Sequence, residues 1–176
     1  MSEPHWLGVA RKYIGTTEVL GPKHNAVIIG WAQKIGGWIA SFYTKDEIPW
    51  CGLFVANCMR ECGYPVPQTA LSARSWAKYG DKISPRVGSI MVFTRSGGGH
   101  VGFYVAEDRD AYHILGGNQS NSVNIARVAK NRFLDSRWPP GAPAATTTTV
   151  TVSNQGSNYK TNFNSGSSSG LSTNEA

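Results

Sequence analysis

The sequence lacks any long hydrophobic run, and this absence argues against a helical membrane protein. No stretch approaches the roughly 18–20 consecutive apolar residues that a membrane-spanning helix needs. The opening residues, MSEPHWLGVARKYIG, carry Glu3 early and contain no apolar stretch of signal-peptide length. We therefore expect a protein without a membrane span, made in the cytoplasm without a signal peptide.

Cysteine is scarce, and its three copies lie close together. Cys51, Cys58 and Cys62 are an odd number within one short segment, which is not the framework of a disulfide-stabilised protein. Their spacings of seven and four residues, with no histidine nearby, do not match a structural zinc site. We expect free thiols, no metal centre and no cofactor.

Clusters of positive charge are also absent, although the chain as a whole is basic. There are 17 Lys and Arg residues against 11 Asp and Glu residues, a formal net charge of +6. Such a balance attracts polyanions in general, whether nucleic acid, anionic lipid or an acidic cell wall. The sequence contains no basic stripe or recognition helix, so we do not expect nucleic acid as a partner.

What the sequence does contain is one domain followed by a tail. The 176 residues are 40% hydrophobic, which suits a single buried core. After RWPPGAP, residues 142–176 are rich in Thr, Ser, Asn and Gly and almost uncharged. Such a segment buries too little apolar area to offset its chain entropy. We expect a domain over residues 1–141 and a tail over residues 142–176 that is disordered or ordered only by a partner.

Within the domain, helical patterns come first and strand patterns follow. The apolar spacing and the glycine stops predict helices over residues 3–15, 24–37, 49–62 and 71–80. Runs rich in β-formers predict strands over residues 88–95, 100–107, 111–117 and 121–129. Helices followed by an antiparallel sheet make an α+β fold.

The helix predicted to begin at Pro49 places Cys51 in its first turn. Unpaired backbone N–H groups and the positive end of the helix dipole favour an anion there, so a thiolate should form more readily than in water. Cys58 and Cys62 lie further along nearly the same face and are interpreted as small buried hydrophobes. A buried core thiol is also the plain interpretation of Cys51, and position alone does not decide.

A nucleophilic cysteine needs a base and an orienting group, and His100 is the best candidate base. It begins a predicted strand after the glycine-rich stretch SGGG, whereas His113 lies inside the next strand. If the hairpin turns around EDRD, the numbers of paired residues sum to about 216–218. His100 then lies opposite residues 116–118, and Asn118 is the better orienting group, with Gln119 in reserve. His113 would lie roughly 10–17 Å away from His100, too far to orient it.

These residues carry a family resemblance. The matching blocks are DEIPWCGLFVANCM, SARSWAKYG, GSIMVF, GGHVGFYV and ILGGNQSNSVNIARV. They resemble phage- and prophage-associated members of the CHAP group (cysteine, histidine-dependent amidohydrolase/peptidase), which is similar to the NlpC-type cell-wall cysteine peptidases. The resemblance covers most of the first 140 residues and none of the tail. It implies a papain-like core, with the nucleophile at a helix N-terminus packed on an antiparallel sheet.

The resemblance implies cleavage of a peptidoglycan amide, either between muramic acid and L-alanine or within the stem peptide. Cys51 would attack, His100 would act as base and then acid, and Asn118 would hold the imidazole. The backbone N–H of Cys51 would help to stabilise the oxyanion. Four polar or aromatic residues near the motif blocks are candidates to bind substrate, with a purely structural role as the alternative for each: Trp50, Gln119, Glu18 and Trp76.

The chain departs from the family pattern in three places. Many relatives have a glutamate shortly before the asparagine, where Gly116 and Gly117 stand here. The acidic calcium loop of some relatives is absent, and Asp46 and Glu47 are interpreted instead as charges at the start of a helix. Ser89 stands where relatives often have an aspartate.

Two function classes remain open. The first is a monomeric peptidoglycan hydrolase, such as a phage lysin that reaches the wall through a holin-type partner or as part of a virion. The alternative is a catalytically inactive wall-binding or virion structural module, in which the tail could be ordered by β-addition to a partner. An acyl transferase on the same residues is a third idea, for which nothing in the sequence argues.

Overall fold

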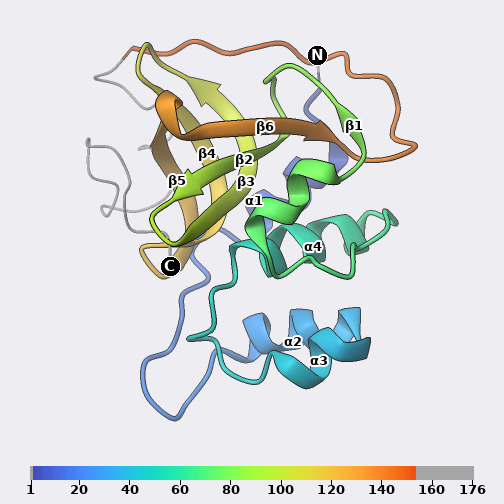
Figure 1. Cartoon of the computed structure of the whole chain (residues 1–176), viewed down its shortest axis with the longest axis vertical. Helices are drawn as coiled ribbons and strands as arrows, with labels where there is room; N and C mark the ends of the chain where they lie inside the picture. Colours follow the sequence, from blue (N-terminus) through green and yellow to red (C-terminus); the bar gives the residue numbers. More distant parts are fainter. Residues whose placement is uncertain (1, 154–176) are drawn as a thin grey trace.

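The computed structural model describes residues 2–153, with helices first and a sheet second (Figure 1). The described helices are α1 (His5–Lys12), α2 (Ala26–Ile35), α3 (Gly37–Phe42), α4 (Cys51–Glu61) and the short 3-10 helices η1 (Ala73–Lys78) and η2 (Lys130–Arg132). The described strands are β1 (Asp81–Lys82), β2 (Ile90–Arg95), β3 (Gly98–Glu107), β4 (Ala111–Gln119), β5 (Ser122–Ala129) and β6 (Phe133–Trp138). The predicted α+β fold is confirmed. Among the described residues, no helix combines the length and apolar character that a membrane crossing requires.

Local signals explain most helix ends. Asn25 caps α2 by accepting a hydrogen bond from the Val27 N–H (2.8 Å), and the helix ends at Gly36, whose φ is 81°. α4 ends just before Cys62, as predicted, but it begins at Cys51 rather than Pro49 because Trp50 has a non-helical backbone (φ −127°, ψ 17°). Cys51 is therefore the first residue of its helix.

The strands form one sheet with antiparallel neighbours, in the order β1-β6-β2-β3-β4-β5. The β3–β4 hairpin turns over residues 108–110, as the EDRD stretch predicts. Phe103 pairs with Leu115, which is the predicted register, but a shift after Tyr104 places His113 opposite Ala106. The sequence analysis missed β6, because FLDSRW mixes charged and apolar residues without clean alternation.

Helix α4 lies at the centre of the core, between the sheet and the pair of α2 and α3 (Figure 1). It packs on β3 and β4 with one side and on α1 and α2 with another, so every residue from Cys51 to Met59 is buried. Fully burying one large apolar side chain contributes about 1.5–3 kcal/mol. The packing of α4 therefore fixes the position of its first residue against the sheet.

The segment after residue 142 stays on the domain for about ten residues. Val87 donates its N–H to the Thr148 carbonyl (3.0 Å) and accepts from the Thr147 hydroxyl (2.7 Å). Glu107 donates to the Val150 carbonyl (2.7 Å) and accepts from the Val152 N–H (2.8 Å). We call Thr147–Val152 the C-terminal strap. The rest of the predicted tail, residues 154–176, lies outside the described residues.

Candidate active site

Cys51 lies at the N-terminus of α4, where backbone donors surround its sulfur. Its side chain is almost completely buried, and this desolvation raises the pKa of the Cys51 thiol. Hydrogen bonds from the N–H groups of Val101, Gly52 and Cys51 itself, and the positive charge of Arg95, act in the opposite direction but do not cancel the effect. The resting group is therefore a thiol that needs a base.

Strand β3 brings the segment that carries the predicted base next to this sulfur. Val101, whose N–H donates to Cys51, directly follows His100 in β3. His100 is fully buried, and its ring stacks loosely on Phe93 of the neighbouring strand (6.4 Å between centroids). The structure thus brings Cys51 and the segment that carries His100 together, although 49 positions separate them in the sequence.

Two glycines allow the close packing that creates this arrangement. A Cβ atom on Gly52 would lie 2.1 Å from the carbonyl oxygen of Ala70. A Cβ atom on Gly117 would lie 2.7 Å from Phe54 and 2.9 Å from Trp50. Both contacts are shorter than real Cβ atoms tolerate, so the start of α4 is pressed against the Ala70 loop on one side and β4 on the other.

The imidazole of His100 is oriented by Gln119. Nε2 of His100 lies 2.9 Å from Oε1 of Gln119. The amide nitrogen of Gln119 donates to the carbonyl oxygens of Ile114 (3.1 Å) and Asn124 (2.8 Å), so the amide oxygen must face the imidazole. Nε2 therefore carries the hydrogen, and Nδ1 is the ring nitrogen that can accept a proton.

This contact favours Gln119, the reserve candidate, over Asn118 as the orienting group. The sequence analysis chose Asn118 as the orienting group and kept Gln119 in reserve, but the hydrogen bond to Nε2 is made by Gln119. The physical reason is a break in the β4–β5 ladder between Gly116 and Gln119, where Asn118 adopts a left-handed backbone (φ 56°). The strand turns there, and the residue after Asn118 reaches the imidazole.

Three further residues were candidates to bind substrate, and only one of them is partly exposed. Trp50 and Trp76 are fully buried, with their indole N–H groups directed at Glu18 (3.3 Å) and at the Ala70 carbonyl (2.9 Å). In this conformation neither indole is accessible to a substrate. Glu18 is half-buried, and its N–H donates to the Asn121 carbonyl (2.9 Å) beside the end of β4.

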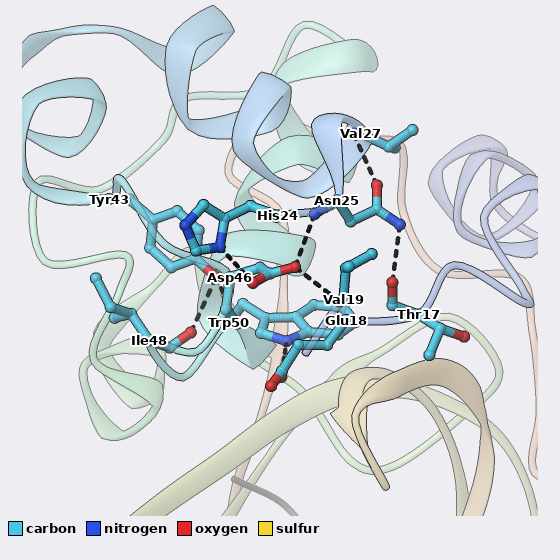
Figure 2. A network of polar contacts seen from close by, with 10 residues as sticks. All are labelled: Thr17, Glu18, Val19, His24, Asn25, Val27, Tyr43, Asp46, Ile48 and Trp50. Atoms are coloured by element: carbon cyan, nitrogen blue, oxygen red, sulfur yellow. Dashed lines mark hydrogen bonds and ion pairs between the residues drawn. The ribbon is translucent and has the colours of Figure 1, made fainter. Parts of the chain in front are cut away.

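Asp46 is not a charge at a helix start, as its position suggested. It is fully buried and accepts hydrogen bonds from the N–H groups of Val19 (2.9 Å) and Asn25 (2.8 Å) and from Nδ1 of His24 (3.0 Å) (Figure 2). Burial acts to raise the pKa of Asp46, but these hydrogen bonds together lower it. Asp46 therefore anchors the loop of residues 17–25, which carries Glu18, to the segment before α4. The half-buried His24 is one of its partners.

The rival base, His113, belongs to a separate ionic cluster. Its Nε2 lies 2.7 Å from Oδ2 of Asp108, which also binds the guanidinium of Arg127 (2.7 and 3.0 Å). The cluster lies at the turn of the β3–β4 hairpin, whereas His100 lies near the other end of β3. Within residues 2–153, no three His, Cys, Asp or Glu side chains are arranged to hold a metal ion.

Sequence reasoning missed two groups that affect the site. Arg95, at the end of β2, and Val101 act on the Cys51 sulfur through charge and a backbone N–H. A backbone donor has no sequence signature. Arg95 could have been noticed only from the pairing of β2 with β3, which places it opposite Gly98, two residues before His100.

Comparison with known proteins agrees with this geometry. Residues 43–118 match the model of the CHAP domain, a span that includes both Cys51 and His100. No curated protein matches the chain. The CHAP match indicates a hydrolase of the cell-wall amidase or peptidase type. Over residues 43–118, the chain is therefore similar to the CHAP domain family.

Proposed function

We propose that this chain is a cysteine-dependent hydrolase that cleaves an amide bond of bacterial peptidoglycan. One observation carries the proposal: the sulfur of Cys51 receives an N–H from Val101, the residue that follows His100, whose imidazole is itself held by Gln119. A nucleophile, a base and an orienting group are the three parts that such catalysis requires.

The reaction begins with proton transfer from the Cys51 thiol to Nδ1 of His100. The thiolate attacks the amide carbonyl carbon, and the oxyanion that forms accepts the backbone N–H of Cys51. The imidazolium then gives its proton to the leaving amine, and a thioester remains on Cys51. Water attacks the thioester while His100 takes its proton, which releases the carboxylic acid and restores the thiol.

The substrate is proposed from charge and from the family match together. A net charge of +6 suits an anionic cell wall, and the CHAP match supports peptidoglycan. The half-buried carboxylate of Glu18, next to Trp50, is available to accept N–H groups of the substrate peptide. The scissile bond is either the one between muramic acid and L-alanine or one within the stem peptide.

Loss of turbidity of purified cell walls tests the proposal. Cys51→Ala and His100→Ala should each lower the rate by about a thousandfold or more. Cys62→Ala is the matched control, because it removes a thiol from the other end of α4 and should leave the rate unchanged. Circular dichroism checks that each variant is folded. Lysis at the wild-type rate by Cys51→Ala would refute the proposal.

Mass spectrometry of the soluble products identifies the bond. An amidase releases intact stem peptides with a new N-terminal L-alanine, whereas an endopeptidase releases fragments with a new terminus inside the stem. Binding to walls without any released fragment would support the inactive wall-binding module instead.

We also propose that the protein acts as a phage- or prophage-associated lysin, which the resemblance of its motif blocks supports. Production in the cytoplasm of a susceptible bacterium should then leave the cells intact until the membrane is permeabilised with chloroform or a holin-type protein. Lysis without permeabilisation would contradict this role.

A further inference from the structure

We propose that Gly116 and Asn124 are positioning residues that together fix the hydrogen position of the His100 imidazole through Gln119. The proposal rests on the proposed hydrolase function, but its tests are separable from those above. Neither residue contacts the substrate in this scheme, and both act only on the amide that holds His100.

Gly116 provides the space in which the orienting hydrogen bond lies. A Cβ atom on Gly116 would be 2.6 Å from Oε1 of Gln119 and 3.3 Å from Nε2 of His100. Its three nearest neighbours are all atoms of this one hydrogen-bonded pair. The φ of Gly116 is not positive, so an alanine fits the backbone there. The steric effect of Gly116→Ala therefore falls on the Gln119–His100 contact and not on the fold.

Asn124 grips the same residue from β5. Its Oδ1 accepts from Nε2 of Gln119 (3.0 Å), and its Nδ2 donates to the Gln119 carbonyl (2.8 Å) and to the Ser122 hydroxyl (2.9 Å). With the Ile114 and Asn124 carbonyls, this makes three acceptors around the amide nitrogen of Gln119. Asn124 thus holds both the backbone and the side chain of the orienting residue.

The orientation matters because a glutamine amide has nearly the same shape when it is rotated by half a turn. In the observed orientation Oε1 accepts from Nε2–H, so Nδ1 of His100 is the ring nitrogen that takes the thiol proton in the proposed reaction. In the rotated orientation the NH₂ group would face Nε2 and favour the tautomer that carries its hydrogen on Nδ1. That tautomer cannot take the proton of Cys51.

The backbone around Gln119 is built to bring these groups together. Gln119 and Ser122 are paired across a two-residue turn in which Ser120 and Asn121 both have positive φ (50° and 61°). Such a turn gives a tight hairpin, and the break in the ladder between Gly116 and Gln119 brings Asn124 within hydrogen-bond reach of Gln119. The tip of the β4–β5 hairpin is therefore part of the catalytic apparatus and not only a connection.

The experiment combines kinetics with nitrogen NMR of the histidine rings. We expect Gly116→Ala to lower kcat by about tenfold or more, with KM within about twofold, because only the base is affected. Asn124→Ala should lower kcat less, by about three- to tenfold, since two backbone acceptors still hold the amide. In a Cys51→Ala background, which removes the thiol, both changes should increase the fraction of neutral His100 with its hydrogen on Nδ1.

The controls separate positioning from stability. Gly8→Ala adds the same methyl group to α1, where no neighbouring atom lies within 4 Å, and should have the kcat of the wild type. Thr147→Val removes one hydrogen bond in the C-terminal strap, so it should lower the melting temperature without changing kcat. Gln119→Met, which removes the amide without crowding position 116, should reproduce the kinetics and the tautomer shift of Gly116→Ala, even if Gly116→Ala proves insoluble.

Each outcome is decisive. Full activity of both Gly116→Ala and Gln119→Met would overturn the proposal, as would a fall in kcat with an unchanged His100 tautomer. An Asn124→Ala variant whose kcat falls no more than that of Thr147→Val at equal loss of stability would remove Asn124 from the scheme. Wild-type lysis by Cys51→Ala would instead overturn the proposed function itself.

Discussion

The carboxylate of Asp46 lies 3.0 Å from Nδ1 of His24, and the same carboxylate accepts two backbone N–H groups from the loop of residues 17–25. The loop thereby stays beside Trp50, one residue from the proposed nucleophile (Figure 2). A buried carboxylate at this point organises a segment that contains little regular secondary structure.

Asp46→Ala should destabilise the domain substantially. It leaves the N–H groups of Val19 and Asn25 without their acceptor, so we expect a loss of about 2–4 kcal/mol in the free energy of unfolding. The exposed neighbour Glu47 gives a matched control: Glu47→Ala should change the free energy of unfolding by less than about 0.5 kcal/mol. Urea titration followed by tryptophan fluorescence measures both. Equal stability of the two variants would show that Asp46 does not anchor the loop.

Acid should unfold the protein partly through Asp108. The Arg127 guanidinium, followed by His113, holds the pKa of Asp108 far below its usual range, against an opposing effect of burial. A carboxyl whose pKa is lowered by folding adds stability above its unfolded pKa of about 3.9, and this stability is lost as the pH falls through the folded pKa. As the pH is lowered from about 5 to about 2, the free energy of unfolding should therefore fall.

Asp108→Asn tests the source of this acid sensitivity. The variant should be less stable at neutral pH and should show a shallower decline on acidification, because it has no carboxyl to protonate at this site. Urea midpoints at several pH values give the two curves. Parallel curves for the wild type and the variant would assign the acid sensitivity to other carboxyls, such as Asp46.

Arg95 should control how readily Cys51 ionises. Burial raises the pKa of Cys51, and the charge of Arg95 opposes that rise. Arg95→Gln should therefore raise the pKa further, so that alkylation by iodoacetamide at neutral pH slows several-fold and the rate rises only at higher pH. Arg11→Gln is the control. It removes a positive charge on α1 that pairs with Glu3, and it should leave the alkylation curve unchanged. A shift in the control, or none in Arg95→Gln, would contradict this account.

The C-terminal strap should be needed for full stability. A chain that ends at residue 141 loses the hydrogen bonds that join Val87 and Glu107 to residues 147–152, so it should be less stable by roughly 2 kcal/mol or more. A chain that ends at residue 153 keeps these bonds and should melt at a higher temperature than the shorter form. Differential scanning calorimetry compares the three forms. Identical melting of the shortest form would show that the strap adds no stability.

Sequence reasoning succeeded where local chemistry determines the structure. The turn at EDRD predicted the pairing of Phe103 with Leu115, the glycine after Cys62 predicted the end of α4, and the predicted helix placed Cys51 in the first turn. Each of these depends on a few neighbouring residues with strong backbone preferences. The same backbone preference misled the prediction once. The adjacent Gly36 and Gly37 predicted only the end of a helix, whereas a further helix, α3, begins at Gly37.

It failed where the decisive contacts come from backbone groups or from an irregular strand. The partners of Asp46 are mainly loop N–H groups, which any sequence provides, and the strap pairs through its main chain although it has the composition of a tail. The left-handed residue at Asn118 shifts the orienting role by one position, and nothing in GGNQS predicts which asparagine or glutamine will face the imidazole.

The burial of Cys51 has a consequence for the lifetime of the protein. Oxidants such as hydrogen peroxide attack exposed thiolates, whereas this sulfur rests as a thiol with only 4% of its residue surface exposed. The half-exposed Cys62 should therefore be oxidised to the sulfenic acid first, at the far end of α4, where the damage spares the reaction. A protein with the proposed hydrolase function would in this way keep its reactive sulfur reduced in aerated surroundings until substrate reaches it.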